Sequence, residues 1–244
     1  MSMKYGFYSD QLLPEGVSQN PKSGMNYNTN SHGYRCPEWK PLPVGKKNVV
    51  ILGCSHTFGV GLNQGEVWVD KLYDKVNKKR LRFWNLAQPG ASADKIVRIL
   101  YGCEKILFPK IIIVCWPVWS RRERLEQYAE SLTSSDSKLK QENQYTDRNN
   151  FLKNVFFVEK FAEKNNARVL HCFSQDVYEL PKADVYNENT LQKCWPVWSK
   201  QKSNHKDRIR INTANLARDN LHYGEKHHER FAELLYKHFK TKLK

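Results

Sequence analysis

The sequence lacks an uninterrupted apolar run of about 18 residues, so we expect no membrane-spanning helix. Residues 1–6 lack the apolar core of a signal peptide, which favours a cytoplasmic location. A protein released by cell lysis or carried in a virion would lack a signal peptide as well, so the sequence does not separate these origins.

None of the six cysteines stands in a Cys-x-x-Cys pair, so buried free thiols are favoured over disulfides or a zinc site. We expect neither a metal nor another cofactor.

Acidic residues are scarce relative to basic ones. The chain has 25 aspartates and glutamates against 40 lysines and arginines, and its net charge is +15. Such a charge attracts nucleic acid, anionic polymers or anionic membrane surfaces. The basic residues are scattered, however, with local concentrations at 200–210 and 237–244, and no stripe of basic and aromatic residues forms a recognisable module. We therefore favour an ordinary solvated surface over nucleic-acid binding.

With 244 residues, the chain is long enough for one well-buried domain. Residues 1–47 are rich in Gly, Pro, Asn and Ser, which predicts an irregular N-terminal arm packed on a domain that spans 48–244. Within that domain, apolar runs alternate with segments of helical periodicity. We expect strands at 49–52, 82–86, 111–115 and 168–173, and helices at 67–77, 93–107, 121–132, 150–164 and 224–239.

This alternation predicts a mainly parallel sheet with helices on both faces. The expected fold is a three-layer α/β/α sandwich around a flavodoxin-like, five-stranded sheet. The fifth strand is expected within 178–216, where Arg208–Ile211 is the candidate, and 133–148 is expected to be a loop or insertion. Functional groups in such sheets gather at the carboxyl ends of the strands. Three residues closely follow a predicted strand: Ser55, Gly90 and Trp116.

Three side chains in two short motifs carry groups that could act together. Residues 53–59 read Gly-Cys-Ser-His-Thr-Phe-Gly, which places Ser55 on a glycine-bounded turn just after a strand. An acid and an imidazole stand three residues apart near the other end, at Asp219 and His222. A hydroxyl needs a base to become a nucleophile, and the base needs an orienting group. We therefore predict Ser55 as nucleophile, His222 as base and Asp219 as the acid that orients it.

The chain resembles the SGNH/GDSL hydrolases in sequence blocks that stand in the same order. Residues 53–59 are similar to the first block, with Cys54 where most members have aspartate. Residues 85–92, Asn-Leu-Ala-Gln-Pro-Gly-Ala-Ser, are similar to the second, and 219–222 to the last. The stretch 30–35, Asn-Ser-His-Gly-Tyr-Arg, looks like a lead-in found before the first block in some members.

The resemblance implies an esterase or deacylase that forms an acyl-Ser55 intermediate. It also makes the backbone amides of Ser55 and Gly90 donors to the oxyanion. Residues 115–122, Cys-Trp-Pro-Val-Trp-Ser-Arg-Arg, depart from the third block because they lack its asparagine, another oxyanion donor. Losing one such donor typically costs about 100- to 1000-fold in rate. Its place is taken by the Ser120 hydroxyl, by the guanidinium of Arg121 or Arg122, or by nothing. Arginine here would also suit a substrate that carries carboxylate or phosphate.

The hexapeptide Cys-Trp-Pro-Val-Trp-Ser occurs twice, at 115–120 and 194–199. One explanation is chance together with aromatic-rich loop packing. The other is that its tryptophans line the mouth of the site, where they would suit sugar rings or an acyl chain. The second explanation favours an O-acetyl group on a carbohydrate as substrate, and we place His56 in the wall of the same pocket. The candidate substrate-binding residues are His56, Trp116, Ser120, Arg121 and Arg122.

Two other functions stay open. A catalytically weak or inactive protein of the same fold would bind a glycan or an anionic ligand; the missing asparagine favours it, and the intact Ser55, Asp219 and His222 oppose it. A basic nucleic-acid-associated protein would be retained on heparin or DNA with a steep dependence on salt. Acyl transfer instead of hydrolysis is a variant of the esterase hypothesis.

Overall fold

The structure is a computed structural model and describes the greater part of the chain. The described residues are 17–20, 25–39, 45–76, 78–124, 130–132, 144–173, 197–199, 208–210 and 215–241. Within these ranges, no helix is both long enough and apolar enough to cross a membrane.

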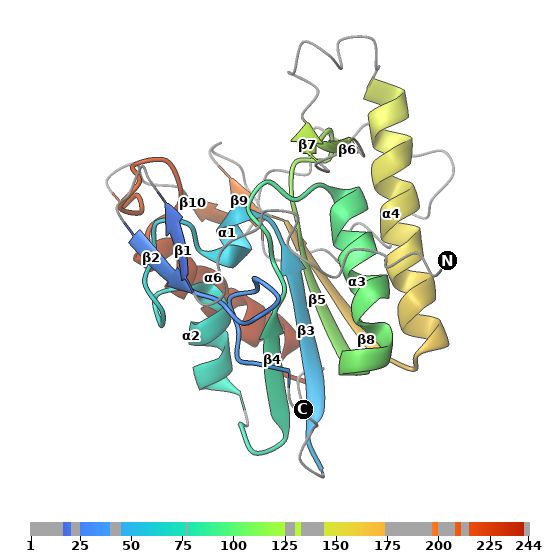
Figure 1. The fold of residues 1–244 in the computed structure, drawn as a ribbon, viewed down its shortest axis with the longest axis horizontal. Coiled ribbons are helices and arrows are strands. Elements are labelled where there is room, and N and C mark those ends of the chain that lie inside the picture. Colours follow the sequence, from blue (N-terminus) through green and yellow to red (C-terminus); the bar gives the residue numbers. More distant parts are fainter. Residues whose placement is uncertain are drawn as a thin grey trace.

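A parallel sheet forms the centre of the described chain (Figure 1). Its six strands lie in the spatial order β10-β9-β8-β5-β3-β4, and every neighbouring pair is parallel. Their bounds are β3 Lys47–Gly53, β4 Leu81–Asn85, β5 Ile111–Trp116, β8 Arg168–Phe173, β9 Val197–Ser199 and β10 Arg208–Arg210. The order of the long strands, β4-β3-β5-β8, is the flavodoxin-like order that was expected.

The predicted count of five strands was wrong, because two short strands follow β8 where one was expected. The candidate at 208–211 is β10, and β9 joins β8 through the single residue pair Phe173 and Val197. A strand of three residues is too short to show an alternating apolar pattern, which is why periodicity did not find β9.

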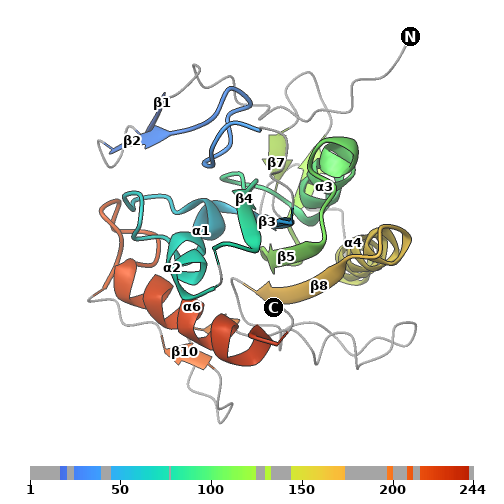
Figure 2. The same cartoon turned by 90° about the horizontal axis from the view of Figure 1, so that it is seen from below.

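Helices cover both faces of the sheet, as the α/β/α prediction requires (Figure 2). The helices are α1 Ser55–Phe58, α2 Trp68–Lys75, α3 Ala93–Leu107, α4 Gln144–Lys164 and α6 Glu225–Phe239. Successive side chains of a strand point to opposite faces. Accordingly, Val50 and Leu52 of β3 pack in the core beneath α3 and α4, while Val49 and Ile51 pack in the core beneath α2 and α6.

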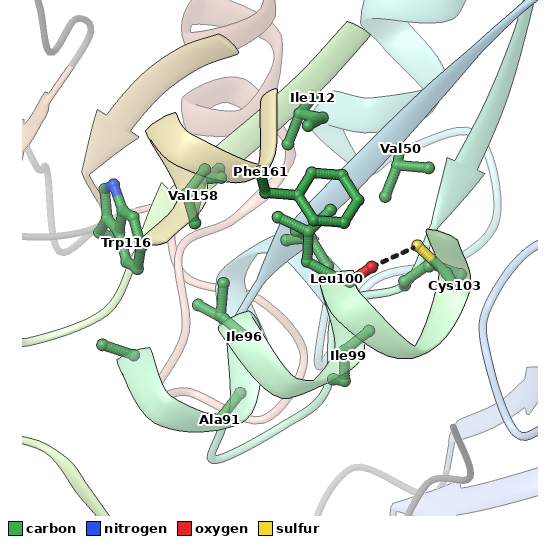
Figure 3. Close-up of a cluster of buried hydrophobic side chains, with 14 of the residues drawn as sticks. Val50, Ala91, Ile96, Ile99, Leu100, Cys103, Ile112, Trp116, Val158 and Phe161 are labelled. Carbon is green, nitrogen blue, oxygen red and sulfur yellow. Dashed lines mark hydrogen bonds between the residues drawn. The ribbon is translucent and has the colours of Figure 1, made fainter. Parts of the chain in front are cut away.

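Helix α3 illustrates how local sequence produces this packing. Figure 3 shows Ile96, Ile99 and Leu100 together in the core, because residues at this spacing share one face of a helix. The helix has its predicted bounds, and Ser92 caps it as expected: its hydroxyl oxygen accepts from the Lys95 amide at 3.2 Å. The start of the helix that follows Gly90 is therefore determined by residues close to it in the sequence.

The segment 121–132 is not the charged helix that its composition predicts. Its described parts form an antiparallel pair, β6 (Arg122–Arg124) with β7 (Glu130–Leu132). Helix α4 begins at Gln144, earlier than predicted, so 144–148 is helical where a loop was expected. The remainder of that expected loop, 133–143, lies outside the described residues.

The N-terminal region contains two short strands instead of being irregular throughout. β1 (Val17–Asn20) pairs antiparallel with β2 (Met25–Asn28). Met25 and Tyr27 are buried, and they share a small core with Phe58, which ends α1. Residues 25–39 therefore pack on the turn that carries Ser55. The domain boundary at residue 47 stays a prediction.

Candidate functional site

The predicted nucleophile, Ser55, is the first residue of α1, directly after β3. Gly53 ends the strand where no side chain would fit, since an added Cβ would lie 2.2 Å from the Thr57 hydroxyl oxygen. Gly59 ends the helix with a left-handed φ of 85°, a conformation that favours glycine. The two glycines hold the partly exposed Ser55 in a tight turn at the carboxyl end of the strand.

Asp219 and His222 lie on a compact loop, 215–224, that is closed by backbone hydrogen bonds. The Ala217 amide donates to the His222 carbonyl at 2.8 Å. Asn220 stands between the two functional residues with a left-handed φ of 58°, which asparagine tolerates better than most residues. The chain reversal turns both side chains of the predicted pair toward each other.

The Asp219 carboxylate holds the His222 imidazole. Its Oδ2 lies 2.5 Å from His222 Nδ1, and its Oδ1 accepts from the amides of Leu221 and His222, each at 3.0 Å. The Asp219 side chain is 2% exposed and that of His222 23%. Burial raises the pKa of Asp219, but the hydrogen bonds outweigh it and leave that pKa below its ordinary value. Because a charged carboxylate only accepts, Nδ1 carries the proton of the neutral ring and Nε2 the lone pair.

Backbone and ring contacts join the two motifs. The Arg218 amide donates to the Gly61 carbonyl at 3.1 Å. Gly61 is so close to Asp219 that an added Cβ would lie 3.1 Å from its Oδ1. The His56 ring centroid lies 5.1 Å from that of His222. The structure thus brings the predicted base beside the residue that follows the predicted nucleophile.

His56 is held between the motifs by ring contacts. Its imidazole stacks on Tyr223, with centroids 4.3 Å apart and an interplanar angle of 18°. Desolvation, followed by the charges of His222, His228 and Arg121, lowers the pKa of His56 well below its ordinary value. The ring is therefore neutral, and its place suits the pocket wall that we predicted, although a contact with substrate stays a prediction.

Gly90 lies at the exposed tip of the loop after β4, with a left-handed φ of 76°. Two hydrogen bonds tie this loop to the nucleophile turn: the Gln88 amide donates to the Gly53 carbonyl at 3.1 Å, and Asn85 Nδ2 to the Thr57 carbonyl at 3.0 Å. No heavy atom of the described residues would lie within 4 Å of a Cβ at Gly90. The loop therefore presents open backbone beside the turn, and its role as oxyanion donor stays a prediction.

Trp116 does not line the mouth of the site, and that prediction was wrong. Its side chain is fully buried in the core beneath α3 and α4. Its Nε1 donates to His171 Nδ1 at 2.9 Å, and His171 Nε2 lies 2.8 Å from a Glu159 carboxylate oxygen. A tryptophan whose ring and N–H are both engaged inside the core has no surface left for a substrate.

The other tryptophans of the repeated hexapeptide give no support to an aromatic mouth. Trp119 is partly buried against the same core as Trp116. Trp198 belongs to β9, and Trp195 lies outside the described residues.

The polar residues after β5 have different surroundings. Arg122 Nε lies 2.7 Å from Asp147, a nearly buried carboxylate of α4, so this arginine serves the fold and is unsuited to binding substrate. Ser120 is buried. Arg121 is partly exposed, and its Nη1 donates to the Ala91 carbonyl at 3.3 Å. Of the three candidate replacements for the missing asparagine, Arg121 is the one with a hydrogen bond to the loop that bears the predicted oxyanion donor.

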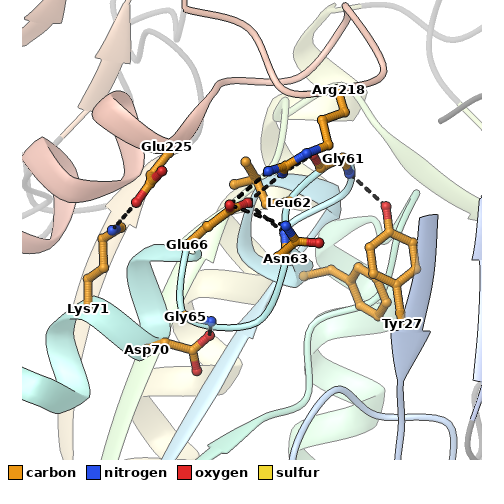
Figure 4. Close-up of polar contacts among 12 residues, drawn as sticks. Tyr27, Gly61, Leu62, Asn63, Gly65, Glu66, Asp70, Lys71, Arg218 and Glu225 are labelled. Carbon is orange, nitrogen blue, oxygen red and sulfur yellow. Dashed lines mark hydrogen bonds and ion pairs between the residues drawn. The ribbon is translucent and has the colours of Figure 1, made fainter. Parts of the chain in front are cut away.

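Sequence inspection missed Glu66 and Arg218, which clamp the two motifs together (Figure 4). The guanidinium donates to both carboxylate oxygens, at 2.5 and 2.8 Å. This hydrogen bonding lowers the pKa of Glu66 to about 2. A second ion pair between the same parts of the chain joins Lys71 to Glu225 at 2.8 Å. No local pattern marks a pair that is 152 positions apart, so only the folded chain reveals it.

Metal-binding side chains do not gather in the described part of the chain: it holds no group of three or more His, Cys, Asp and Glu suited to an ion. The five cysteines that it includes are free thiols, and four of them are buried.

Comparison with known proteins gives structural neighbours without sequence relatives. No family model matches the chain, and no curated protein matches it. It is similar to the psychrotrophic esterase EstA from Pseudoalteromonas sp., with a TM-score of 0.48 and 16% identity, covering 81% of this chain and 99% of that chain. It is also similar to the family 3 carbohydrate esterase of Clostridium thermocellum (TM-score 0.47, 15% identity, 81% of this chain and 97% of that). A third is a member of the lipolytic G-D-S-L family from Veillonella parvula (TM-score 0.43, 12% identity, 80% and 98%). At these identities and TM-scores, no activity is transferred to this chain.

Proposed function

We propose that this protein is a serine ester hydrolase of SGNH type, with Ser55 as nucleophile, His222 as base and Asp219 as its orienting acid. One observation carries the proposal. A buried carboxylate holds His222 Nδ1 at 2.5 Å, and that imidazole lies against the residue next to Ser55, on the glycine-bounded turn after β3. The proposal is also supported by the sequence blocks, which stand in the same order as in SGNH hydrolases.

In this mechanism, His222 Nε2 takes the Ser55 hydroxyl proton as Oγ attacks the ester carbonyl carbon. The amides of Ser55 and Gly90 donate to the oxyanion that forms. The tetrahedral intermediate collapses, His222 returns the proton to the leaving alcohol, and an acyl-Ser55 ester remains. Water then attacks the acyl carbon while His222 takes its proton. The bond from the acyl carbon to Ser55 Oγ breaks, His222 returns the proton to Oγ, and the acid is released. Asp219 stabilises the imidazolium during both halves of the reaction.

The substrate that we propose is a small ester, and an O-acetyl group on a carbohydrate is the first class to test. The burial of Trp116 removes one of the aromatic residues that favoured sugar rings. Esters that carry an anionic group should be tested in the same panel of substrates. Two features favour them: the net charge of +15 and the placement of Arg121.

A fluorophosphonate probe, read by intact mass, tests the proposal. We expect a stoichiometric adduct on the wild type, because the reagent reacts with an activated serine. Ser55→Ala and His222→Ala should both abolish it. Ser31→Ala is the matched control, since this exposed serine bonds to Glu38 outside the site, and it should be labelled like the wild type. A folded wild type without adduct would refute the esterase and support a ligand-binding protein of the same fold.

Arg121→Ala should lower the activity by about 100-fold, which is typical for the loss of one oxyanion donor. Steady-state kinetics on the best ester of the panel measure the effect. A fall in kcat alone assigns the guanidinium to the oxyanion, whereas a rise in KM alone assigns it to an anionic part of the substrate. Arg230→Ala, an exposed change on α6, is the control. Kinetics of Arg121→Ala within about twofold of wild type would mean that Arg121 does not replace the missing asparagine.

A further inference from the structure

The N-terminal segment 25–39 contributes a buried arginine to the nucleophile turn. Arg35 is 5% exposed. Its Nη1 donates to the carbonyls of Phe58 and Gly59, at 3.1 and 2.8 Å, and its Nη2 to the carbonyl of Leu62 at 2.8 Å. The last carbonyls of a helix have no partner within the helix, so the guanidinium supplies acceptors at the end of α1 and just beyond it with hydrogen bonds. The Gly59 carbonyl also accepts from the Leu62 amide at 3.2 Å.

The surroundings of Arg35 leave it little freedom. Its guanidinium carbon lies 5.0 Å from the centre of the Tyr27 ring, and an added Cβ at Gly59 would lie 3.1 Å from Nη1. Burial lowers the pKa of Arg35, and the nearby Asp70 above all opposes that shift. A planar guanidinium with fixed donors suits three converging carbonyls, which a lysine ammonium cannot match.

Tyr27 adds a second contact from the same segment. Its hydroxyl oxygen accepts from the Gly61 amide at 2.7 Å (Figure 4). Gly61 in turn lies against Asp219, as described above. The short stretch 58–62 therefore connects the helix that begins at Ser55 to the carboxylate that holds His222. Arg35 and Tyr27 hold that stretch through hydrogen bonds to its backbone.

The segment also reaches the loop of Gly90. Gln88 Nε2 donates to the Gly33 carbonyl at 3.4 Å. Residues 25–39 thus contact the nucleophile turn and the oxyanion loop directly, and the acid–base loop through Gly61.

We propose that Arg35 is a positioning residue that sets the spacing between Ser55 and the Asp219–His222 pair by fixing the carbonyls of Phe58, Gly59 and Leu62. Its effect on rate rests on the proposed esterase function, while its effect on the geometry of the acid–base loop does not. Since Arg35 touches neither the predicted nucleophile nor the base, it acts through the backbone alone.

Arg35→Ala should lower kcat by about 100-fold and leave KM within about twofold, because a small misplacement of reacting groups costs rate more than binding. Millimolar guanidinium ion, which can refill the vacated space, should restore part of kcat. Arg35→Lys keeps the charge without the fork, folds more readily than the alanine variant, and should show a similar loss of kcat. The control is Arg230→Ala, an exposed change on α6. It should keep the wild-type kcat and show no response to guanidinium.

A measurement that needs no activity separates this proposal from the proposed function. With ¹⁵N-labelled histidine, the Nδ1 proton of His222 is identified by its loss in His222→Ala. Arg35→Ala and Arg35→Lys should broaden this proton or speed its exchange with water, and guanidinium should reverse the change in the alanine variant.

If the wild type neither reacts with the fluorophosphonate nor hydrolyses esters, the proposed function fails, and the Nδ1 signal alone decides the role of Arg35. An unchanged signal in a folded Arg35→Lys variant would overturn the positioning role. A kcat loss that merely follows the fraction of unfolded protein, without rescue by guanidinium, would overturn it as well.

Discussion

Asp219→Asn is expected to lower kcat by about 10⁴-fold while the protein stays folded. The asparagine oxygen can still accept from the Leu221 and His222 amides, so the loop keeps its backbone bonds. Its NH₂ group, however, donates where the carboxylate accepted. His222 Nδ1 must then accept, which moves the ring proton to Nε2, and Nε2 can no longer take the proton of Ser55.

Ester hydrolysis under saturating substrate measures this effect, with circular dichroism as a check on folding. The matched control is Asp74→Asn, an exposed carboxylate of α2 that pairs with Lys78, and it should keep the wild-type kcat. Activity of Asp219→Asn within about tenfold of wild type would remove the acid from the mechanism and leave a serine–histidine pair.

Acid should destabilise this protein strongly, and buried His228 is one reason. Its Nδ1 accepts from the Trp68 amide at 3.0 Å, the first amide of α2, where no side chain of α2 itself caps the helix. Burial, assisted by His227 and Arg35, lowers the pKa of His228 from 6.5 to about 3. The folded protein therefore keeps this ring neutral at a pH where the unfolded chain protonates it.

Proton linkage determines the direction in which the free energy of unfolding changes with pH. Below pH 6.5 the unfolded state binds a proton that the folded state does not, so the free energy of unfolding falls as the pH drops toward 3. A shift of this size corresponds to a loss on the order of 4 kcal/mol across that range. The lowered pKa values of His56 and Asp219 act in the same direction, since the stabilisation from each group is also lost on acidification.

The variant His228→Asn tests the role of His228 in acid lability. The Oδ1 of the asparagine can accept from the Trp68 amide, but the side chain does not titrate. We expect lower stability at pH 7, owing to lost packing, together with a much flatter slope between pH 6.5 and 3. Urea unfolding at a series of pH values measures both. Lys226→Asn, on an exposed position of the same helix, should keep the wild-type slope. A slope left unchanged by His228→Asn would assign the acid lability to other groups.

Several elements could be predicted because their causes are local. Helix α3 was found with both bounds from the spacing of its apolar residues and the Ser92 cap. β3 and β5 were found as continuous apolar runs, which is typical of parallel strands buried on both faces. In each case, residues within a few positions of one another suffice to determine the conformation.

The sequence-based predictions that were wrong failed because of contacts between residues far apart in the chain. The charged stretch 121–132 resembles a solvated helix, yet Arg122 pairs with Asp147 of α4, and its described parts are strands. Trp116 resembled a binding residue because it follows a strand, but its indole N–H is bonded to His171 in the core. Neither partner is visible from the neighbouring sequence.

By itself, the sequence determined the parallel α/β architecture and the three residue types of the proposed triad, because apolar periodicity, glycine turns and the short spacing of Asp219 and His222 act locally. Only the tertiary structure decided how these residues meet. The contact of Gly61 with Asp219, the clamp of Glu66 on Arg218 and the bonds from Arg35 join positions far apart in the chain. Such contacts depend on the path of the folded backbone, which no local pattern encodes.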